Sequence, residues 1–371
     1  MLLLRLQLLF FCSVTHIEGW IGCRGLQGEQ VDWFVVYKPP TTNRSEAKFY
    51  YADADHSSFK LSSLSIDNKA TAVGATLQPF YEHNKASLRG HFVFAYSDDS
   101  PTKKADSHRG HAKGVVLFDN DSGFWVIHSV PNFPPLGTYS YPETGMKFGQ
   151  TILCLTLPTG SLGDVGDHLR YIQATPYFSN LPDHFRLSFP VLLNIVKKKS
   201  LSRADTKFTK IAQLNTVRGL PLISFAKHKK FGKDLWFDLV APELGANLAV
   251  ESWLNGGADD LDSTCTKRTS VYDVTSVTLP DVSFNSTRDH SKWAVADEAD
   301  GGKSYVCIGD MNRQKSQLRR GGGAVCLQHF GLSITFRDVV KSVQPCVSKK
   351  SRSYSICTSC MLLLLVLLIA V

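Results

Sequence analysis

The feature that most constrains this 371-residue chain is a repeated segment. The first copy, HAKGVVLFDNDSGFWVIHSVPN, covers residues 111–132, and the second, HSKWAVADEADGGKSYVCIGDMN, covers residues 290–312. Each copy begins with His-x-Lys, passes through an apolar stretch into a turn rich in Asp and Gly, and resumes an apolar strand that ends near an asparagine. The separations from histidine to asparagine are 21 and 22 residues. Agreement in both motif and spacing predicts two halves related by duplication.

The two His-x-Lys pairs are the candidate catalytic residues. Residues i and i+2 of a strand face the same side, so His111 and Lys113 should present an imidazole beside an ammonium group, as should His290 and Lys292. Two such pairs around a pseudo-twofold axis suit a phosphodiester. The lysines would neutralise its oxygens, while one histidine attacks phosphorus and the other protonates the leaving oxygen. This chemistry needs no metal ion and no cofactor.

Asn132 and Asn312 close the two copies and are expected to donate amide hydrogens to the same phosphate. A single His-x-Lys triplet is common and usually faces solvent, so the prediction depends on the matched pair. Which of the two histidines attacks phosphorus is left open.

The N-terminus and the cysteines indicate an exported protein. Residues 1–19 hold one arginine within an apolar run, followed by small and polar residues, which predicts a signal peptide cleaved near Gly19. The cysteines of the body form an even set that predicts disulfides: Cys23, Cys154, Cys265, Cys307, Cys326 and Cys346. None of these pairs has C-x-x-C spacing, so a zinc site is not expected. Asn43 and Asn285 lie in N-glycosylation sequons, and use of a third at Asn120 is left open.

The C-terminus ends in an uninterrupted apolar run, MLLLLVLLIAV, which is too short to cross a bilayer as a helix. Together with the polar spacer before it, residues 347–371 resemble a GPI-anchor signal. The alternative is an apolar tail without an anchoring role. We therefore expect a protein of the secretory pathway that is secreted or lysosomal, or held at the cell surface by a lipid anchor.

The charge of the chain favours a polyanionic partner. The formal net charge is +8, and 12 histidines would add positive charge in an acidic compartment. The lysine-rich runs 197–199 and 227–233 either follow a nucleic-acid backbone or form solvated faces. Arg320 and the glycines at 321–323 either bind phosphate through backbone amides or form a mobile basic loop.

Apolar runs at 31–38, 91–97, 114–118 and 124–130 predict strands, and residues 189–199 predict a helix. Their irregular alternation indicates an α+β fold. We expect an N-terminal lobe over residues 20–165 with the first motif and a C-terminal lobe over residues 166–346 with the second.

Several of these segments resemble the deoxyribonuclease II family, which belongs to the phospholipase D-like superfamily. The similarity extends over residues 23–346 and includes VDWFVVYK (31–38), RGHAKG (109–114), GFWVIHSVPNFPP (123–135), SFNSTRDHSKW (283–293) and CIGDMNR (307–313). The resemblance implies an acid endonuclease that hydrolyses DNA without divalent metal and leaves 3′-phosphate ends. It also implies catalytic roles for both histidines and both lysines.

The resemblance further implies a two-lobed pseudo-dimer with mixed β-sheets flanked by helices. The disulfides that it implies are Cys23–Cys154, Cys265–Cys346 and Cys307–Cys326. The chain departs from the family at Ala112, where threonine is usual, and at Ala294, where cysteine is common. Asp119 and Asp297 fall outside the register of the phospholipase D aspartate, so the sequence assigns no carboxylate to orient a histidine.

Two other functions remain open. The same fold could serve a catalytically silent secreted or surface protein that binds DNA or a receptor, or a phosphodiesterase directed at phospholipids. Strand preference is also left open, and a homodimer is an open expectation.

Overall fold

The computed structural model describes residues 20–82, 89–202, 204–297 and 303–346. The predicted signal peptide at 1–19 and the predicted anchor signal at 347–371 lie outside these residues. Within them, no helix is long and apolar enough to span a membrane.

The fold is α+β, with two large sheets packed against each other. The first sheet has the strand order β10-β6-β7-β8-β9-β3-β4-β5. Its members are β3 (Trp33–Lys38), β4 (Tyr50–Asp53), β5 (Lys60–Leu61), β6 (Phe92–Ser97), β7 (Lys113–Phe118), β8 (Ser122–His128), β9 (Gln150–Pro158) and β10 (Pro176–Asn180). The short strands β1 (Cys23–Arg24) and β2 (Gln30–Val31) form a separate pair.

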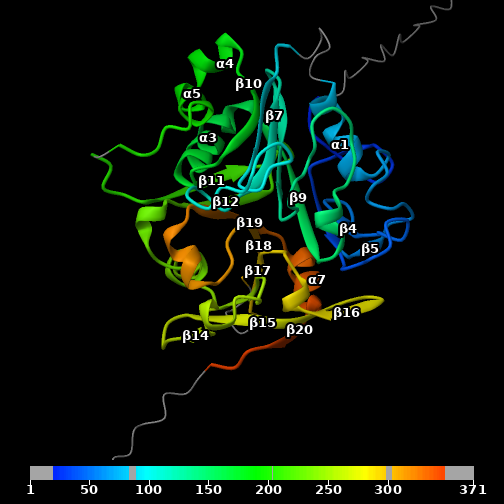
Figure 1. The fold of residues 1–371 in the computed structure, drawn as a ribbon, viewed down its shortest axis with the longest axis vertical. Coiled ribbons are helices and arrows are strands. Elements are labelled where there is room, and N and C mark those ends of the chain that lie inside the picture. The colour runs from blue at the N-terminus through cyan, green and yellow to red at the C-terminus, as the bar shows by residue number, and fades with distance from the viewer. Residues whose placement is uncertain (1–19, 83–88, 203, 298–302, 347–371) are drawn as a thin grey trace, which may run out of the picture.

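The second sheet has the order β11-β12-β19-β18-β17-β13-β15-β14, and β16 and β20 also pair with β15. Its members are β11 (Thr209–Asn215), β12 (Pro221–Lys227), β13 (Leu248–Glu251), β14 (Thr264–Cys265), β15 (Ser270–Leu279), β16 (Val282–Asn285), β17 (Trp293–Ala296), β18 (Tyr305–Gly309), β19 (Gly322–Gln328) and β20 (Val340–Val343). In Figure 1, β18, β17 and β15 of this sheet lie below β7 and β9 of the first.

Helices flank the sheets. They are α1 (Ala72–Tyr81), α2 (Glu143–Met146), α3 (Leu162–Tyr171), α4 (Asp183–Ser188), α5 (Pro190–Val196), α6 (Ala241–Leu244) and α7 (Phe330–Val339). In Figure 1, α3, α4 and α5 gather beside β10, whereas α1 lies on the opposite side of the first sheet. The helix predicted at 189–199 corresponds to α5, which begins at Pro190 in the favoured first position and ends before Lys198, where φ is +55°.

The core explains why the strands read as continuous apolar runs. All six residues of β3 are buried because this sheet is covered on both faces. One core cluster joins the sheets and includes Trp33 and Tyr37 from the first with Trp293 and Ile308 from the second. A second cluster lies beneath α1, and a third lies in the second lobe around Trp236. The first sheet is therefore sandwiched between two apolar layers.

Strand order confirms the internal repeat. The run β6-β7-β8-β9-β3 of the first sheet matches β13-β17-β18-β19-β12 of the second, both in space and in order along the chain. The registers agree as well, because Gly114 pairs with Ile127 where Trp293 pairs with Ile308. A helix follows the fourth strand of each set, α3 after β9 and α7 after β19. The two His-x-Lys motifs and the central strands around them therefore have equivalents in both halves.

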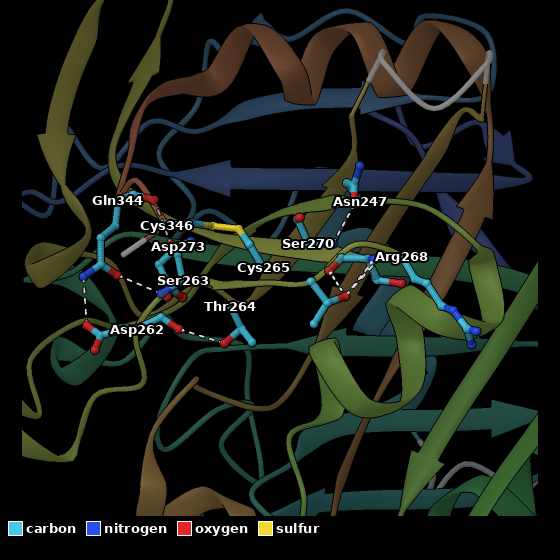
Figure 2. The surroundings of a disulfide bond; sticks show 12 residues. Asn247, Asp262, Ser263, Thr264, Cys265, Arg268, Ser270, Asp273, Gln344 and Cys346 are labelled. Atoms are coloured by element: carbon cyan, nitrogen blue, oxygen red, sulfur yellow. Dashed lines mark hydrogen bonds between the residues drawn. A yellow bond between two sulfur atoms is a disulfide. The ribbon is translucent and has the colours of Figure 1, made fainter. Parts of the chain in front are cut away.

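Three disulfides lie among the described residues, and they are the three that the family resemblance implies. Cys23–Cys154 ties β1 to β9, and Cys307–Cys326 joins neighbouring strands β18 and β19. Cys265–Cys346 fastens the end of the described chain to β14, as Figure 2 shows. Around this last disulfide, the Ser263 hydroxyl donates to the Gln344 carbonyl at 2.8 Å and the Gln344 amide donates to Asp262 at 2.9 Å. The C-terminal segment is thus held by side chains as well as by the disulfide.

Candidate active site

Both His-x-Lys motifs lie where a central strand begins. His111 comes just before β7 and Lys113 is its first residue, whereas His290 and Lys292 both precede β17. Both lysines are buried and both histidines are partly buried. The backbone N–H of His111 donates to the Gly321 carbonyl at 2.8 Å, and that of His290 donates to the Gly149 carbonyl at 2.9 Å. Gly321 and Gly149 belong to opposite lobes, so each histidine is bound to the lobe that does not carry it.

The structure brings the two motifs into one site. Burial lowers the pKa of His290 to about 2, and the charges of Lys292, Lys113 and Lys38 lower it further. Burial likewise holds the pKa of His111 well below its ordinary value, and the contributing cations include Lys292 of the other motif. The pKa of each imidazole is therefore lowered by the ammonium group of the opposite lobe as well as by that of its own lobe.

His111 is held between an amide and a carboxylate. Its Nδ1 lies 2.9 Å from the Oε1 of Gln317, and its Nε2 lies 3.9 Å from the Oδ2 of Asp98. Because an amide oxygen only accepts hydrogen bonds, this contact places a proton on Nδ1. The other ring nitrogen is then free to exchange a proton or to attack.

Asp98 connects His111 to two cations. Its Oδ1 accepts a 2.6 Å hydrogen bond from Lys113, and its Oδ2 lies 3.1 Å from Arg320. Burial raises the pKa of Asp98, but Lys113, His111 and Arg320 outweigh this effect and hold it below its usual range. Asp98 is therefore the ionised carboxylate beside this histidine. Asp119 instead caps the turn between β7 and β8, where it accepts the backbone N–H of Ser122.

His290 is held by aromatic rings. Phe148 stacks on it with ring centroids 4.1 Å apart and planes at 10°, and Trp253 meets it edge-on at 4.2 Å. Its Nε2 is buried and has no hydrogen-bond partner among the described residues. The Nζ of Lys292 donates to the His290 carbonyl. His290 is thus a desolvated imidazole that lies next to a cation.

The two surroundings occupy equivalent positions in the repeat. The strand registers align Asp98 with Trp253 and Arg320 with Phe148. Around one histidine these positions hold an Asp–Arg ion pair, and around the other they hold two rings whose centroids are 5.6 Å apart. The same scaffold therefore builds one charged cage and one aromatic cage.

Buried carboxyl groups surround Lys292. Burial lowers the pKa of Lys292 to about 7, with a further contribution from Lys113. Burial raises the pKa of Asp310 to about 8, and it raises that of Asp289, which accepts a hydrogen bond from Tyr37 of the first lobe. At acid pH, Lys292 is therefore charged and Asp310 is neutral.

The structure adds His128, which sequence reasoning did not single out. It ends β8 and lies across from Lys113, one residue beyond the pair Gly114–Ile127. Burial lowers its pKa to about 3, with Lys113 adding to the effect. Its Nδ1 accepts the backbone N–H of Val130 at 3.2 Å, so the ring proton lies on Nε2. The sequence signal that could have identified His128 is its position at the end of the apolar strand that follows the first motif.

Asn132 and Asn312 use their amide groups within loops. Asn132 donates to the Asp99 carboxylate at 3.0 Å and adopts a φ of +56°. Asn312 accepts the backbone N–H of Trp253 at 3.3 Å and donates to Gln314 at 3.4 Å. Their role as phosphate donors stays a prediction. In the described parts of the chain, no group of three or more His, Cys, Asp or Glu side chains is arranged to hold a metal ion.

Comparison with known proteins agrees with this architecture. The family profile described as deoxyribonuclease II matches residues 22–346. "Cell-death-related nuclease 7" of Caenorhabditis elegans is 46% identical over 344 residues, covering 92% of each chain. "Deoxyribonuclease-2-alpha" of Rattus norvegicus is 39% identical over 342 residues, which cover 88% of this chain and 95% of the relative. "Plancitoxin-1" of Acanthaster planci is 35% identical over 339 residues, which cover 88% and 92%. The chain therefore belongs to the deoxyribonuclease II family.

Proposed function

We propose that this protein is an acid endonuclease that hydrolyses DNA phosphodiester bonds without a divalent metal and leaves 3′-phosphate ends. The observation that carries the proposal is that each lysine lowers the pKa of the histidine of the opposite lobe, Lys292 that of His111 and Lys113 that of His290. Two imidazoles and two ammonium groups around one point provide an attacking nitrogen, a proton donor and charge compensation. The names of the family relatives supply the substrate.

The reaction proceeds in two displacements. One imidazole nitrogen attacks phosphorus, and the bond from phosphorus to O5′ breaks as the second histidine, in its imidazolium form, gives its proton to O5′. Phosphorus stays on O3′ and is bound to the first histidine. A water molecule then attacks phosphorus and passes its proton to the second histidine, which is now neutral. The N–P bond breaks, and this releases a 3′-phosphate and restores both rings.

Acid activity follows from the surroundings of the lysines. With a pKa of about 7, Lys292 carries its charge below neutral pH and loses it as the pH rises through 7. Burial also opposes protonation of both histidines, so the imidazolium form requires both acid and the anionic substrate. Activity should therefore be confined to the acid side of neutrality.

A cationic surface beside His111 supports a polymeric substrate. The guanidinium of Arg109 donates to the Lys198 carbonyl at 3.2 Å, and Lys229 donates to the His108 carbonyl at 3.5 Å. Burial lowers the pKa of Lys198, and the nearby charges of Lys103 and Arg109 lower it further. Parts of both lysine runs thus converge two and three residues from His111, a suitable arrangement for phosphates flanking the scissile one. Lys227 is the exception, because it is buried.

A nuclease assay at pH 5 in EDTA tests the proposal. Wild type should nick supercoiled plasmid, and the products should accept label only after phosphatase removes the 3′-phosphate. His111→Ala and His290→Ala should each lose activity by at least about 100-fold, whereas His56→Ala, whose side chain is 87% exposed, should retain it. Loss of cleavage in EDTA would refute the proposal. DNA binding without turnover by wild type would instead favour the catalytically silent alternative.

We also propose that the chain enters the secretory pathway. The side chains of Asn43 and Asn285 are exposed, so both predicted sequons are accessible to glycosylation. Expression in cultured animal cells, followed by removal of N-glycans, should shift the mobility of the protein. The shift should be smaller in Asn43→Gln, and the absence of any shift in wild type would contradict this route.

A further inference from the structure

Two buried lysines occupy equivalent positions in the lobes, and the reaction scheme above does not use them. Lys38 is the last residue of β3 and pairs with Gln150, the first residue of β9. Lys227 is the last residue of β12 and pairs with Gly322, the first residue of β19. Their exposed fractions are 0% and 1%. The repeat therefore places one buried ammonium group in each half.

Both ammonium groups bond main-chain carbonyls. The Nζ of Lys38 donates to Pro39 at 2.7 Å and to Met146 at 2.8 Å. The Nζ of Lys227 donates to Gln317 at 3.2 Å, and the same atom reaches Leu318 at 3.0 Å and Arg320 at 2.8 Å. Burial lowers the pKa of Lys38 to about 7 and that of Lys227 to about 8. Burying a cation is costly unless its hydrogen bonds are satisfied, so these contacts fix the carbonyls as firmly as they fix the lysines.

The segment fixed by Lys38 touches His290 of the other lobe. Two residues after Met146, the ring of Phe148 stacks on the His290 imidazole at 4.1 Å. The next carbonyl, of Gly149, accepts the His290 backbone N–H at 2.9 Å. A change in the path of residues 146–149 would therefore move both the ring and the backbone of His290.

The segment fixed by Lys227 does the same for His111. The Oε1 of Gln317 contacts the His111 Nδ1 at 2.9 Å, and the Gly321 carbonyl accepts the His111 backbone N–H at 2.8 Å. In both halves, the lysine lies in one lobe and the histidine that it reaches through a loop lies in the other.

We propose that Lys38 and Lys227 are reciprocal positioning residues, each of which holds the loop that seats the histidine of the opposite lobe. Lys38 acts on His290 through residues 146–149, and Lys227 acts on His111 through residues 317–321. The kinetic consequence rests on the proposed nuclease function, whereas the structural consequence for the two rings does not.

Histidine ring NMR on the full chain gives the first test. In protein labelled with 15N-histidine, Lys38→Met should shift the ring signals of His290 and leave those of His111 in place. Lys227→Met should do the reverse. Val36→Ala and Leu222→Ala, which truncate buried neighbours in the same two strands, are the controls for general loosening. Equal shifts of both histidines in every variant would overturn the proposal.

Kinetics at pH 5 give the second test. Each lysine variant should lower kcat by about 10- to 100-fold with KM within about twofold, the effect expected of a misplaced catalytic group. The loss in Lys227→Met should be non-additive with Gln317→Ala, and the loss in Lys38→Met should be additive with it. Should the Met variants fail to fold, Lys38→Gln and Lys227→Gln keep a donor and should show smaller changes in the same pattern. If the losses in kcat of both lysine variants were additive with that of Gln317→Ala, the proposal would be overturned. If wild type were inactive but each lysine variant still shifted only the ring signals of the histidine in the opposite lobe, only the nuclease assignment would be refuted.

Discussion

Replacing His290 by asparagine should make the protein more resistant to acid than wild type. The folded protein opposes protonation of this ring, because burial among Phe148 and Trp253 lowers its pKa from 6.5 to about 2. In the unfolded chain the ring takes up a proton near its ordinary pKa. Below about pH 6.5 the unfolded state therefore binds more protons, and the free energy of unfolding falls as the pH falls.

The size of the effect follows from the pKa difference. Each pH unit between the two pKa values changes stability by about 1.4 kcal/mol for one group. At pH 5, about 1.5 units below 6.5, His290 should thus destabilise wild type by at most about 2 kcal/mol relative to pH 7. Asparagine has no such titration. The difference in unfolding free energy, variant minus wild type, should therefore rise by about 2 kcal/mol between pH 7 and pH 5.

Urea unfolding followed by tryptophan fluorescence measures this difference at both pH values. His56→Asn, at a position whose side chain is 87% exposed, is the control for replacing a histidine by asparagine away from the site. An equal difference at the two pH values for His290→Asn would refute the reasoning, because it would mean that the folded state accommodates the protonated ring.

Three further changes have expected outcomes. Gln317→Ala removes the acceptor of His111 Nδ1 and should lower kcat about 10-fold with little change in KM, as steady-state kinetics would show; an unchanged kcat would contradict its role. Burial raises the pKa of Asp310 to about 8, so this carboxyl group lowers the free energy of unfolding as the pH rises from about 4 to 8. Asp310→Asn should therefore raise the free energy of unfolding by at most about 4 kcal/mol at pH 7 and leave it unchanged at pH 4, as urea unfolding would measure. Replacing Cys23 and Cys154 by serine opens a link between residues 131 apart and should cost about 2–5 kcal/mol, seen as a lower melting temperature; an unchanged melting temperature would contradict it.

The sequence predicted the halves of the site because each motif is local. His111 and Lys113, like His290 and Lys292, are two residues apart. The internal repeat predicts that the two pairs share one site. The residues that surround them could not be found in this way. Gln317 is 206 positions from His111, and the ring that stacks on His290 comes from the loop before β9.

Burial also changed the interpretation of single residues. Lys227 belongs to a lysine-rich run that the sequence predicts to be a surface, yet the exposed fraction of Lys227 is 1%. Charge alone could not separate it from Lys229 and Lys230, which are exposed. Strand pairing decides the matter, because Lys227 ends β12 inside the sheet and the others lie in the turn that follows.

The unequal cages around the two histidines bear on the polarity of the bound strand. At a site with perfect twofold symmetry, a phosphodiester bound in either of two opposite directions would meet identical surroundings, and the two histidines would simply exchange roles. Here Asp98 and Arg320 lie beside His111, and Trp253 and Phe148 occupy the equivalent positions beside His290. The two opposite directions of the bound strand therefore meet different surroundings, one charged and one aromatic, and are no longer equivalent. We expect this difference to select one direction of the bound strand, and with it one of the two histidines as the nucleophile.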